Sequence, residues 1–214
     1  MTQNLLPALT AVAIMLLIAF PVHEFSHALA AFRLGDSTAR YMGRLTLDPR
    51  VHFDPMGALM LAISAFVGVF IGWAKPTPVN PTNLQGGRRG EAIVAVAGPV
   101  SNLVLAVLVA IPLRLIGASP EIQAEVFGNP VTGFVYGVLE FFVLINVFLF
   151  IFNLLPIPPL DGWKVLTGLV DSRTAYNLRQ VEQYGFILII VILLAGGRII
   201  GPIGFGLFEL LVGA

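Results

Sequence analysis

The stretch LLPALTAVAIMLLIAFPVHEFSHALAAFRL, residues 5–34, places three ionisable side chains at residues 23–27 inside an apolar run, with Arg33 near the end of the run. The run is long enough to cross a bilayer as one helix, which needs about 20 residues. Gly35 and Asp36 mark the predicted end of this helix. An ionisable group near the centre of a membrane helix costs roughly 2.5–3.5 kcal/mol. Because three such groups lie together at residues 23–27, a functional site is favoured over a merely solvated polar face.

The three ionisable residues belong to the pentapeptide HEFSH, in which His23 and His27 are four positions apart. On a helix this spacing puts both imidazoles on one face, within reach of a single ion. Glu24 lies beside them, close enough to act on a water molecule without occupying a ligand position. Two neutral imidazoles on a divalent ion, with a carboxylate beside the water, make up most of a zinc hydrolase. Pro21, two residues before His23, is expected to kink this helix.

The composition is that of an integral membrane protein. Of the 214 residues, 57% are hydrophobic and only 11% are charged, whereas soluble domains carry about 25% charged residues. The net charge is zero, and no basic patch suggests a nucleic acid partner. The chain has no cysteine, so the candidate metal ligands are His, Asp and Glu.

Further apolar runs follow the first one, separated by polar or proline-rich segments. They lie at residues 55–73, 91–116, 132–152 and 184–212, with a loop expected at 117–131 and a break at GGR, 196–198. The runs predict an all-α polytopic membrane protein with five to six apolar segments in the lipid bilayer. We expect one membrane-embedded domain over residues 1–214, with its core at about 5–170 and C-terminal helices at 171–214.

Asp161 is the candidate for a third protein ligand. It follows Pro156, Pro158 and Pro159, which forbid a regular helix, and it precedes Gly162. A broken helix at membrane depth is tolerated only where protein or a water-filled cavity satisfies its backbone. An acid displayed from such a break could complete a zinc site, or it could cap the next helix from a turn at the membrane surface. The local sequence leaves these two interpretations open.

Two motifs together resemble the site-2 protease family of intramembrane metalloproteases, whose marks are H-E-x-x-H and N-x-x-P-x-x-x-L-D-G. HEFSH matches the first mark, and NLLPIPPLDG at residues 153–162 matches the second. AGPVSN at residues 97–102 is similar to a G-P-x-x-N segment found between the two marks in many members. The resemblance covers about residues 5–170, and the larger members' PDZ or CBS modules have no counterpart in this sequence.

The resemblance implies an intramembrane zinc metalloprotease that hydrolyses a peptide bond within or near a transmembrane segment of a membrane protein substrate. It implies one Zn²⁺ ion held by His23, His27 and Asp161. It also implies that Glu24 is the general base. The residues implied to position the substrate strand or stabilise the oxyanion are Asn153 and Asn102.

Arginine residues indicate the orientation in the membrane. Arg33, Arg40, Arg44 and Arg50 form the densest positive cluster of the chain. The positive-inside rule therefore places this side in the cytoplasm and predicts an active site reached from there. His52, a lone histidine in the same polar segment, is expected at the surface.

The number of membrane crossings constrains the fold. The 132–153 helix brings Asp161 to His23 most easily if it runs in the same direction as the first helix, which requires an odd number of crossings between the two. The sequence offers two apolar runs there, so we hypothesise that residues 55–73 are re-entrant and return through the proline-rich chain that follows. The candidate extended segments for pairing with an unwound substrate strand are residues 40–47 and 73–79.

Two other functions were weighed against this one. The first is a non-proteolytic membrane metal-binding or transport protein that uses the same His and Asp cluster as a relay, which would not need Glu24. The second is another H-E-x-x-H class of membrane protease, with a glutamate as third ligand. The apolar helices offer only Glu140 and Glu209 for that role, neither in the expected pattern, so the second alternative is disfavoured.

Overall fold

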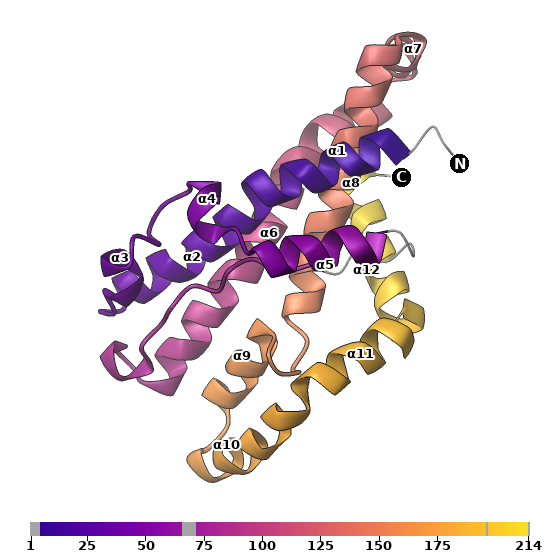
Figure 1. The fold of residues 1–214 in the computed structure, drawn as a ribbon. Helices are drawn as coiled ribbons and strands as arrows, with labels where there is room; N and C mark the ends of the chain where they lie inside the picture. The colour runs from indigo at the N-terminus through magenta and orange to yellow at the C-terminus, as the bar shows by residue number, and fades with distance from the viewer. Residues whose placement is uncertain (1–4, 66–71, 196, 214) are drawn as a thin grey trace.

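Three long apolar helices form the body of the protein in the computed structural model, which describes residues 5–65, 72–195 and 197–213 (Figure 1). The helices long and apolar enough to span a membrane are Leu9–Arg33, Arg88–Gly117 and Pro130–Asn153, and the bent C-terminal pair adds a fourth if it is one span. No strand occurs in the described residues. The prediction of an all-α polytopic membrane protein is confirmed.

The first span is continuous but changes its helical form. It consists of α1 (Leu5–Ile14), a π-helical turn at Met15–Ala19 and α2 (Phe20–Arg33). In the π turn the Phe20 N–H donates to Met15 O, five residues back. Pro21 has no N–H, and its ring crowds the carbonyl group four residues earlier, which makes the regular α pattern unfavourable at this place. The irregularity expected at Pro21 is this π turn.

Helix α6 (Arg88–Gly117) runs antiparallel to the first span, and α8 (Pro130–Asn153) runs parallel to it (Figure 1). Pro7 lies against Gly137 near the beginning of both elements, and Met15 clusters with Phe142 further along. One full crossing, α6, therefore separates the first span from α8. This is the odd number that the approach of Asp161 to His23 requires.

The apolar run at residues 55–73 begins as helix α5 (Pro55–Ala65), while residues 66–71 of that run lie outside the described residues. Its two flanks meet, because the Lys75 N–H donates to His52 O at 2.8 Å. A full crossing would separate the flanks by about 30 Å. The segment therefore enters and leaves on one side, as the hypothesis of re-entry requires.

The polar segment after α2 contains two short helices, α3 (Thr38–Tyr41) and α4 (Pro49–His52). Residues 40–47 include the end of α3 and the turns after it, so the prediction that they are extended is wrong. The prediction that His52 lies at the surface is also wrong. Its side chain is buried, with Nε2–H donating to Thr46 O at 2.8 Å.

The expected loop at residues 117–131 contains helix α7 (Pro120–Gly128). Ser119 is its N-cap and accepts a hydrogen bond from the Ile122 N–H, with proline at the first helical position and Glu121 in the first turn. These are ordinary signals for a helix start, and the sequence carries them.

The chain after α8 turns at the proline-rich segment, and α9 then continues along α6 towards its beginning, so that Gly168 lies against Arg88 and Ala92. The elements in this part are α9 (Asp161–Leu169), α10 (Ser172–Leu178), a 3₁₀ turn at Arg179–Tyr184, α11 (Gly185–Ala195) and α12 (Gly197–Val212), and a further 3₁₀ turn at Pro81–Asn83 precedes α6. Helix α12 packs against α6 and α8 through Val212 and its partly buried neighbours (Figure 1).

Gly168 allows α9 to lie close against α6. A Cβ atom at this position would be 2.5 Å from Arg88 O and 2.7 Å from Ala92 Cβ. Because Asp161 is on the same short helix, this contact also fixes where Asp161 lies.

We predict that Gly168→Ala lowers the free energy of unfolding by about 1–3 kcal/mol, as overpacking of a tight contact does. The measurement is thermal unfolding of the purified protein in detergent. Gly201→Ala in α12 is the matched control, because a Cβ there meets no atom within 4 Å and alanine is favoured over glycine in a helix by about 1 kcal/mol. Equal stability of the two variants would contradict the prediction.

Candidate metal centre

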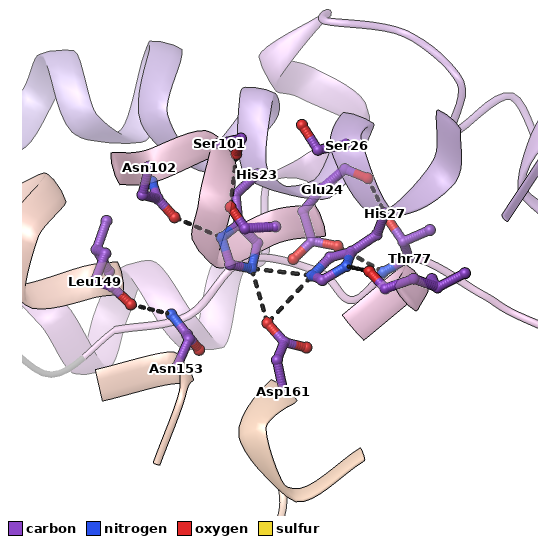
Figure 2. Close-up of polar contacts among 12 residues, drawn as sticks. His23, Glu24, Ser26, His27, Thr77, Ser101, Asn102, Leu149, Asn153 and Asp161 are labelled. Carbon is purple, nitrogen blue, oxygen red and sulfur yellow. Dashed lines mark hydrogen bonds and ion pairs between the residues drawn. The ribbon is translucent and has the colours of Figure 1, made fainter. Parts of the chain in front are cut away.

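Three donor atoms from α2 and α9 converge on one point (Figure 2). The distances are 3.1 Å between His23 Nε2 and His27 Nε2, and 3.2 Å from each of these nitrogens to Asp161 Oδ2. The two rings stand edge to face at 83°, and both are buried. Asp161 is the first residue of α9 and lies 134 positions after His27 in the sequence. The structure thus brings together the three residues predicted as metal ligands.

The opposite nitrogen of each ring is held by an acceptor. His23 Nδ1 lies 2.6 Å from Asn102 Oδ1, and His27 Nδ1 lies 2.7 Å from Val94 O. Both oxygens accept, so each Nδ1 carries the proton and each Nε2 presents a lone pair to the other donors. Two lone pairs and a carboxylate oxygen then face one another with no hydrogen atom between them. Such an arrangement is repulsive unless a cation lies among the three atoms.

The donor set fits zinc. Donors bound about 2 Å from one tetrahedral zinc ion lie about 3.3 Å from each other, close to the spacing found for His23, His27 and Asp161. Two imidazole nitrogens with one carboxylate oxygen are a common protein ligand set for catalytic zinc, with a fourth position left open. Among the described residues these three form the group that could hold a metal ion. Glu140 and Glu209, the alternative third ligands, are not part of it.

One face of α6 supports the centre with three residues at intervals of four. Val94 O accepts from His27, Asn102 Oδ1 accepts from His23, and Gly98 lies between them. A Cβ atom on Gly98 would be 2.3 Å from His27 Nε2 and 2.6 Å from His23 Nε2. The missing side chain therefore keeps open the space in which the donor atoms meet.

Asp161 is the first residue of α9, and its side chain turns toward the histidines instead of capping its own helix. The prolines before it end α8, and Gly162 permits the tight return, because a Cβ there would lie 2.2 Å from Leu154 O. Trp163 Nε1–H donates to Glu182 Oε1 at 3.0 Å and ties α9 to the next part of the chain. The geometry fits the interpretation of Asp161 as a metal ligand, and it does not fit the interpretation of Asp161 as a helix cap.

Glu24 lies next to the donors but is held by a different element. Its Oε2 accepts from the Thr77 N–H at 2.7 Å, and its main-chain carbonyl accepts from Thr77 Oγ1–H at 3.0 Å (Figure 2). Thr77 belongs to residues 74–80, an extended segment that we call the strap. The strap leaves the second carboxylate oxygen of Glu24 without a hydrogen bond among those described, so that oxygen is available to a reactant.

Asp36 anchors the far end of the strap to the end of α2. It is fully buried and accepts from Asn80 N–H at 2.7 Å, from Asn83 Nδ2–H at 3.2 Å and from both the N–H and the hydroxyl of Thr38. Burial alone would raise the pKa of Asp36, but these hydrogen bonds outweigh it and hold the pKa below its ordinary value. The anchor is therefore intact at neutral pH and weakens only as the pH falls through that lowered pKa.

The strap is a poor template for strand addition. The N–H groups of Lys75 and Thr77 already donate to His52 O and Glu24. The alternate positions are Pro76 and Pro78, which have no N–H to offer. This pattern argues against the predicted pairing of a substrate strand with residues 73–79, and it assigns the strap to holding Glu24.

The two asparagines of the motifs lie in different surroundings. Asn102 is fully buried and uses its amide oxygen on His23 and its amide nitrogen on Asn146. Asn153 is partly exposed and donates from Nδ2 to Leu149 O at 2.9 Å, within its own helix. Asn102 is therefore too deeply buried for the predicted contact with substrate, with its amide oxygen and its amide nitrogen each already bonded, whereas Asn153 is partly exposed and has a free amide oxygen.

From the sequence alone, no role was assigned to three residues of this region, Thr77, Gly98 and Asn146, although Gly98 belongs to the AGPVSN segment. Gly98 carried a signal, because a glycine inside a helix costs about 1 kcal/mol relative to alanine and needs a reason. Asn146 also carried one, as a lone amide in an apolar run. Nothing local to Thr77 indicates that it would meet Glu24, which lies 53 positions away.

Known proteins match this chain over most of its length. A family model described as peptidase family M50 matches residues 11–196. "Putative zinc metalloprotease YwhC" of Bacillus subtilis (strain 168) is 38% identical over 179 residues, which are 84% of this chain and 78% of the relative. "Putative zinc metalloprotease Rip2" of Mycolicibacterium smegmatis is 33% identical over 178 residues, which are 83% of this chain and 64% of the relative. No solved structure matches the chain.

The matched residues include both motifs and all three converging donors. Zinc is accordingly the cofactor of this protein, and the donor set of the centre fits that ion. The chain belongs to peptidase family M50, the site-2 protease family of zinc metalloproteases.

Proposed function

We propose that the protein hydrolyses a peptide bond within or next to a transmembrane segment of a membrane protein. The observation that carries this proposal is the convergence of His23, His27 and Asp161 beside Glu24. The two histidines and Glu24 lie on a helix long and apolar enough to span a bilayer. A metal site and a free carboxylate oxygen at that depth are suited to a substrate that also lies in the membrane.

The site lies nearer to one membrane surface than to the other. His27 precedes Arg33, at the end of the span, by six positions, or about 9 Å along a helix. The arginines that follow Arg33 in the sequence favour the cytoplasm for this side, by the positive-inside rule. We therefore propose that substrate and water reach the centre from the cytoplasmic side.

In the reaction, His23, His27 and Asp161 hold the ion, and Glu24 moves the proton. Zinc, when bound, lowers the pKa of water and polarises a carbonyl group. The free oxygen of the Glu24 carboxylate takes a proton from the attacking water as the water oxygen adds to the scissile carbonyl carbon. Glu24 then passes this proton to the leaving nitrogen as the C–N bond breaks. Thr77 fixes the other carboxylate oxygen and so aims the free one.

A transmembrane substrate must unwind before it can be cut, because its helical peptide groups are hydrogen-bonded and shielded. Asn153 is the proposed contact for the unwound strand. Its amide carbonyl oxygen and one amide N–H remain free when the other N–H bonds to Leu149 O.

We propose one domain over residues 1–214, since α12 packs directly on α6 and α8.

We predict that Glu24→Gln reduces cleavage by at least 100-fold, within the range of roughly 10²–10⁴ for the loss of a general base, and leaves bound zinc unchanged. The measurement is co-expression with a panel of tagged single-span membrane proteins, followed by immunoblotting. Glu121→Gln on α7 is the control and should cleave normally, because Glu121 is exposed and far along the chain from the centre. A transporter that uses the same cluster as a relay would retain its activity in Glu24→Gln.

We predict that Asp161→Asn weakens zinc binding by more than the roughly 100-fold that loss of an outer-shell partner can cause, because a charged ligand is removed. Zinc content is measured by mass spectrometry of the purified protein, and affinity by competition with a chelator. Asp171→Asn is the control, since Asp171 caps the exposed α10. Wild-type zinc content in Asp161→Asn would refute the assigned ligand set.

We predict that Gly98→Ala loses zinc while the protein stays folded, since the new methyl group occupies the space between the donors. Gly117→Ala, at the open end of the same helix, should bind zinc like wild type. The comparison uses chelator competition together with thermal unfolding of the zinc-free proteins. Equal zinc affinity in the two variants would contradict the assigned role of Gly98.

A further inference from the structure

Two side-chain amides are buried in the apolar interface between α6 and α8. Asn102 and Asn146 are both completely buried. Burial of an amide without hydrogen bonds costs a free energy of about 2–7 kcal/mol, depending on the reference state. Both amides are therefore expected to be bonded, and they form one continuous chain of hydrogen bonds that ends at the metal centre.

The direction of this chain is set at its far end. Phe142 O is a backbone carbonyl and can only accept, so Asn146 must present its nitrogen there, at 2.9 Å. That choice leaves Asn146 Oδ1 to accept from Asn102 Nδ2–H at 3.0 Å. It leaves Asn102 Oδ1, in turn, to accept from His23 Nδ1–H at 2.6 Å.

The consequence for His23 is a fixed tautomer. With the proton on Nδ1, the lone pair of Nε2 faces His27 and Asp161, as binding of a metal requires. His27 obtains the same tautomer directly, from the backbone carbonyl of Val94 at 2.7 Å. His23 has an amide in place of that carbonyl, and an amide has two orientations of nearly equal shape.

The other orientation of Asn102 would disable the site. Its NH₂ group would then face His23 Nδ1, the ring proton would move to Nε2, and an N–H would point at the other two ligands. Among the described residues, the acceptor on Asn146 makes this orientation unfavourable, because the flipped Asn102 would place two oxygen atoms against each other in a buried interface. Asn146, acting through Asn102, therefore keeps the proton of His23 on Nδ1, as Val94 O keeps the proton of His27 on Nδ1.

We propose that Asn146 is a positioning residue of the metal centre, which fixes the orientation of Asn102 and through it the metal-binding tautomer of His23. The proposal rests on the proposed function only in taking His23, His27 and Asp161 as the zinc ligands. Asn146 touches none of these ligands among the described hydrogen bonds, and neither motif contains it.

The test compares variants by zinc affinity, measured by chelator competition on the full-length protein in detergent. Asn146→Ala and Asn146→Leu remove the acceptor, and we expect each to weaken zinc binding by about 10–100-fold, the usual effect of losing an outer-shell partner. Asn146→Asp in its protonated form can donate its O–H to Phe142 O and still accept from Asn102 through its carbonyl oxygen, so it should bind zinc almost like wild type. Val147→Ala is the matched control, since Val147 is the adjacent, fully buried residue and its loss leaves a cavity in the same helix.

Unchanged zinc affinity in Asn146→Ala and Asn146→Leu, or an equal loss in Val147→Ala, would overturn the proposal. His23→Ala in the same titration separates this outcome from failure of the proposed function, because wild-type affinity in His23→Ala would refute the ligand set itself. A second measurement compares the nitrogen NMR spectra of the zinc-free wild type and zinc-free Asn146→Ala, both labelled with ¹⁵N-histidine. A proton held on Nδ1 of His23 in the wild type but not in Asn146→Ala supports the proposal, and the same tautomer of His23 in both proteins overturns it.

Discussion

The approach of three electron-pair donors to one another is the constraint on which the rest of the structure depends. His23 Nε2, His27 Nε2 and Asp161 Oδ2 lie 3.1–3.2 Å apart, with the ring protons held on the opposite sides of the imidazoles. Neutral imidazoles and a carboxylate do not gather in this way without a cation. The packing of α9 against α6, which depends on Gly168, holds the carboxylate of Asp161 at this centre.

Helix α6 acts as the platform of the centre, although none of its residues is a proposed ligand. Val94, Gly98 and Asn102 occupy successive turns on the face toward α2, and each has a different task. One carbonyl group orients a histidine, one absent side chain leaves room, and one amide orients the other histidine. Helical periodicity explains the spacing, since residues four apart lie one above the other.

The chain reaches this arrangement through a re-entrant segment and a strap. The flanks of residues 55–73 meet at His52 and Lys75, and α6 is the one full crossing that the described residues place between the first span and α8. The first span and α8 then run in the same direction (Figure 1), and Asp161, which follows α8, lies 3.2 Å from both His23 Nε2 and His27 Nε2. The strap that follows the re-entrant segment supplies the N–H that holds Glu24. Its alternating prolines keep the exposed edge from pairing with other strands.

The sequence by itself determined the class of protein and the pair of histidines, because hydrophobic run length and four-residue spacing are local properties of a helix. It also determined that a proline-broken segment displays Asp161, although whether that acid is a ligand or a cap was not decided locally. Only the tertiary structure places Asp161 beside the two histidines, and only it indicates the roles proposed for Thr77, Gly98 and Asn146. These roles depend on contacts between segments 44 to 138 positions apart, and helix packing, not local periodicity, sets such distances.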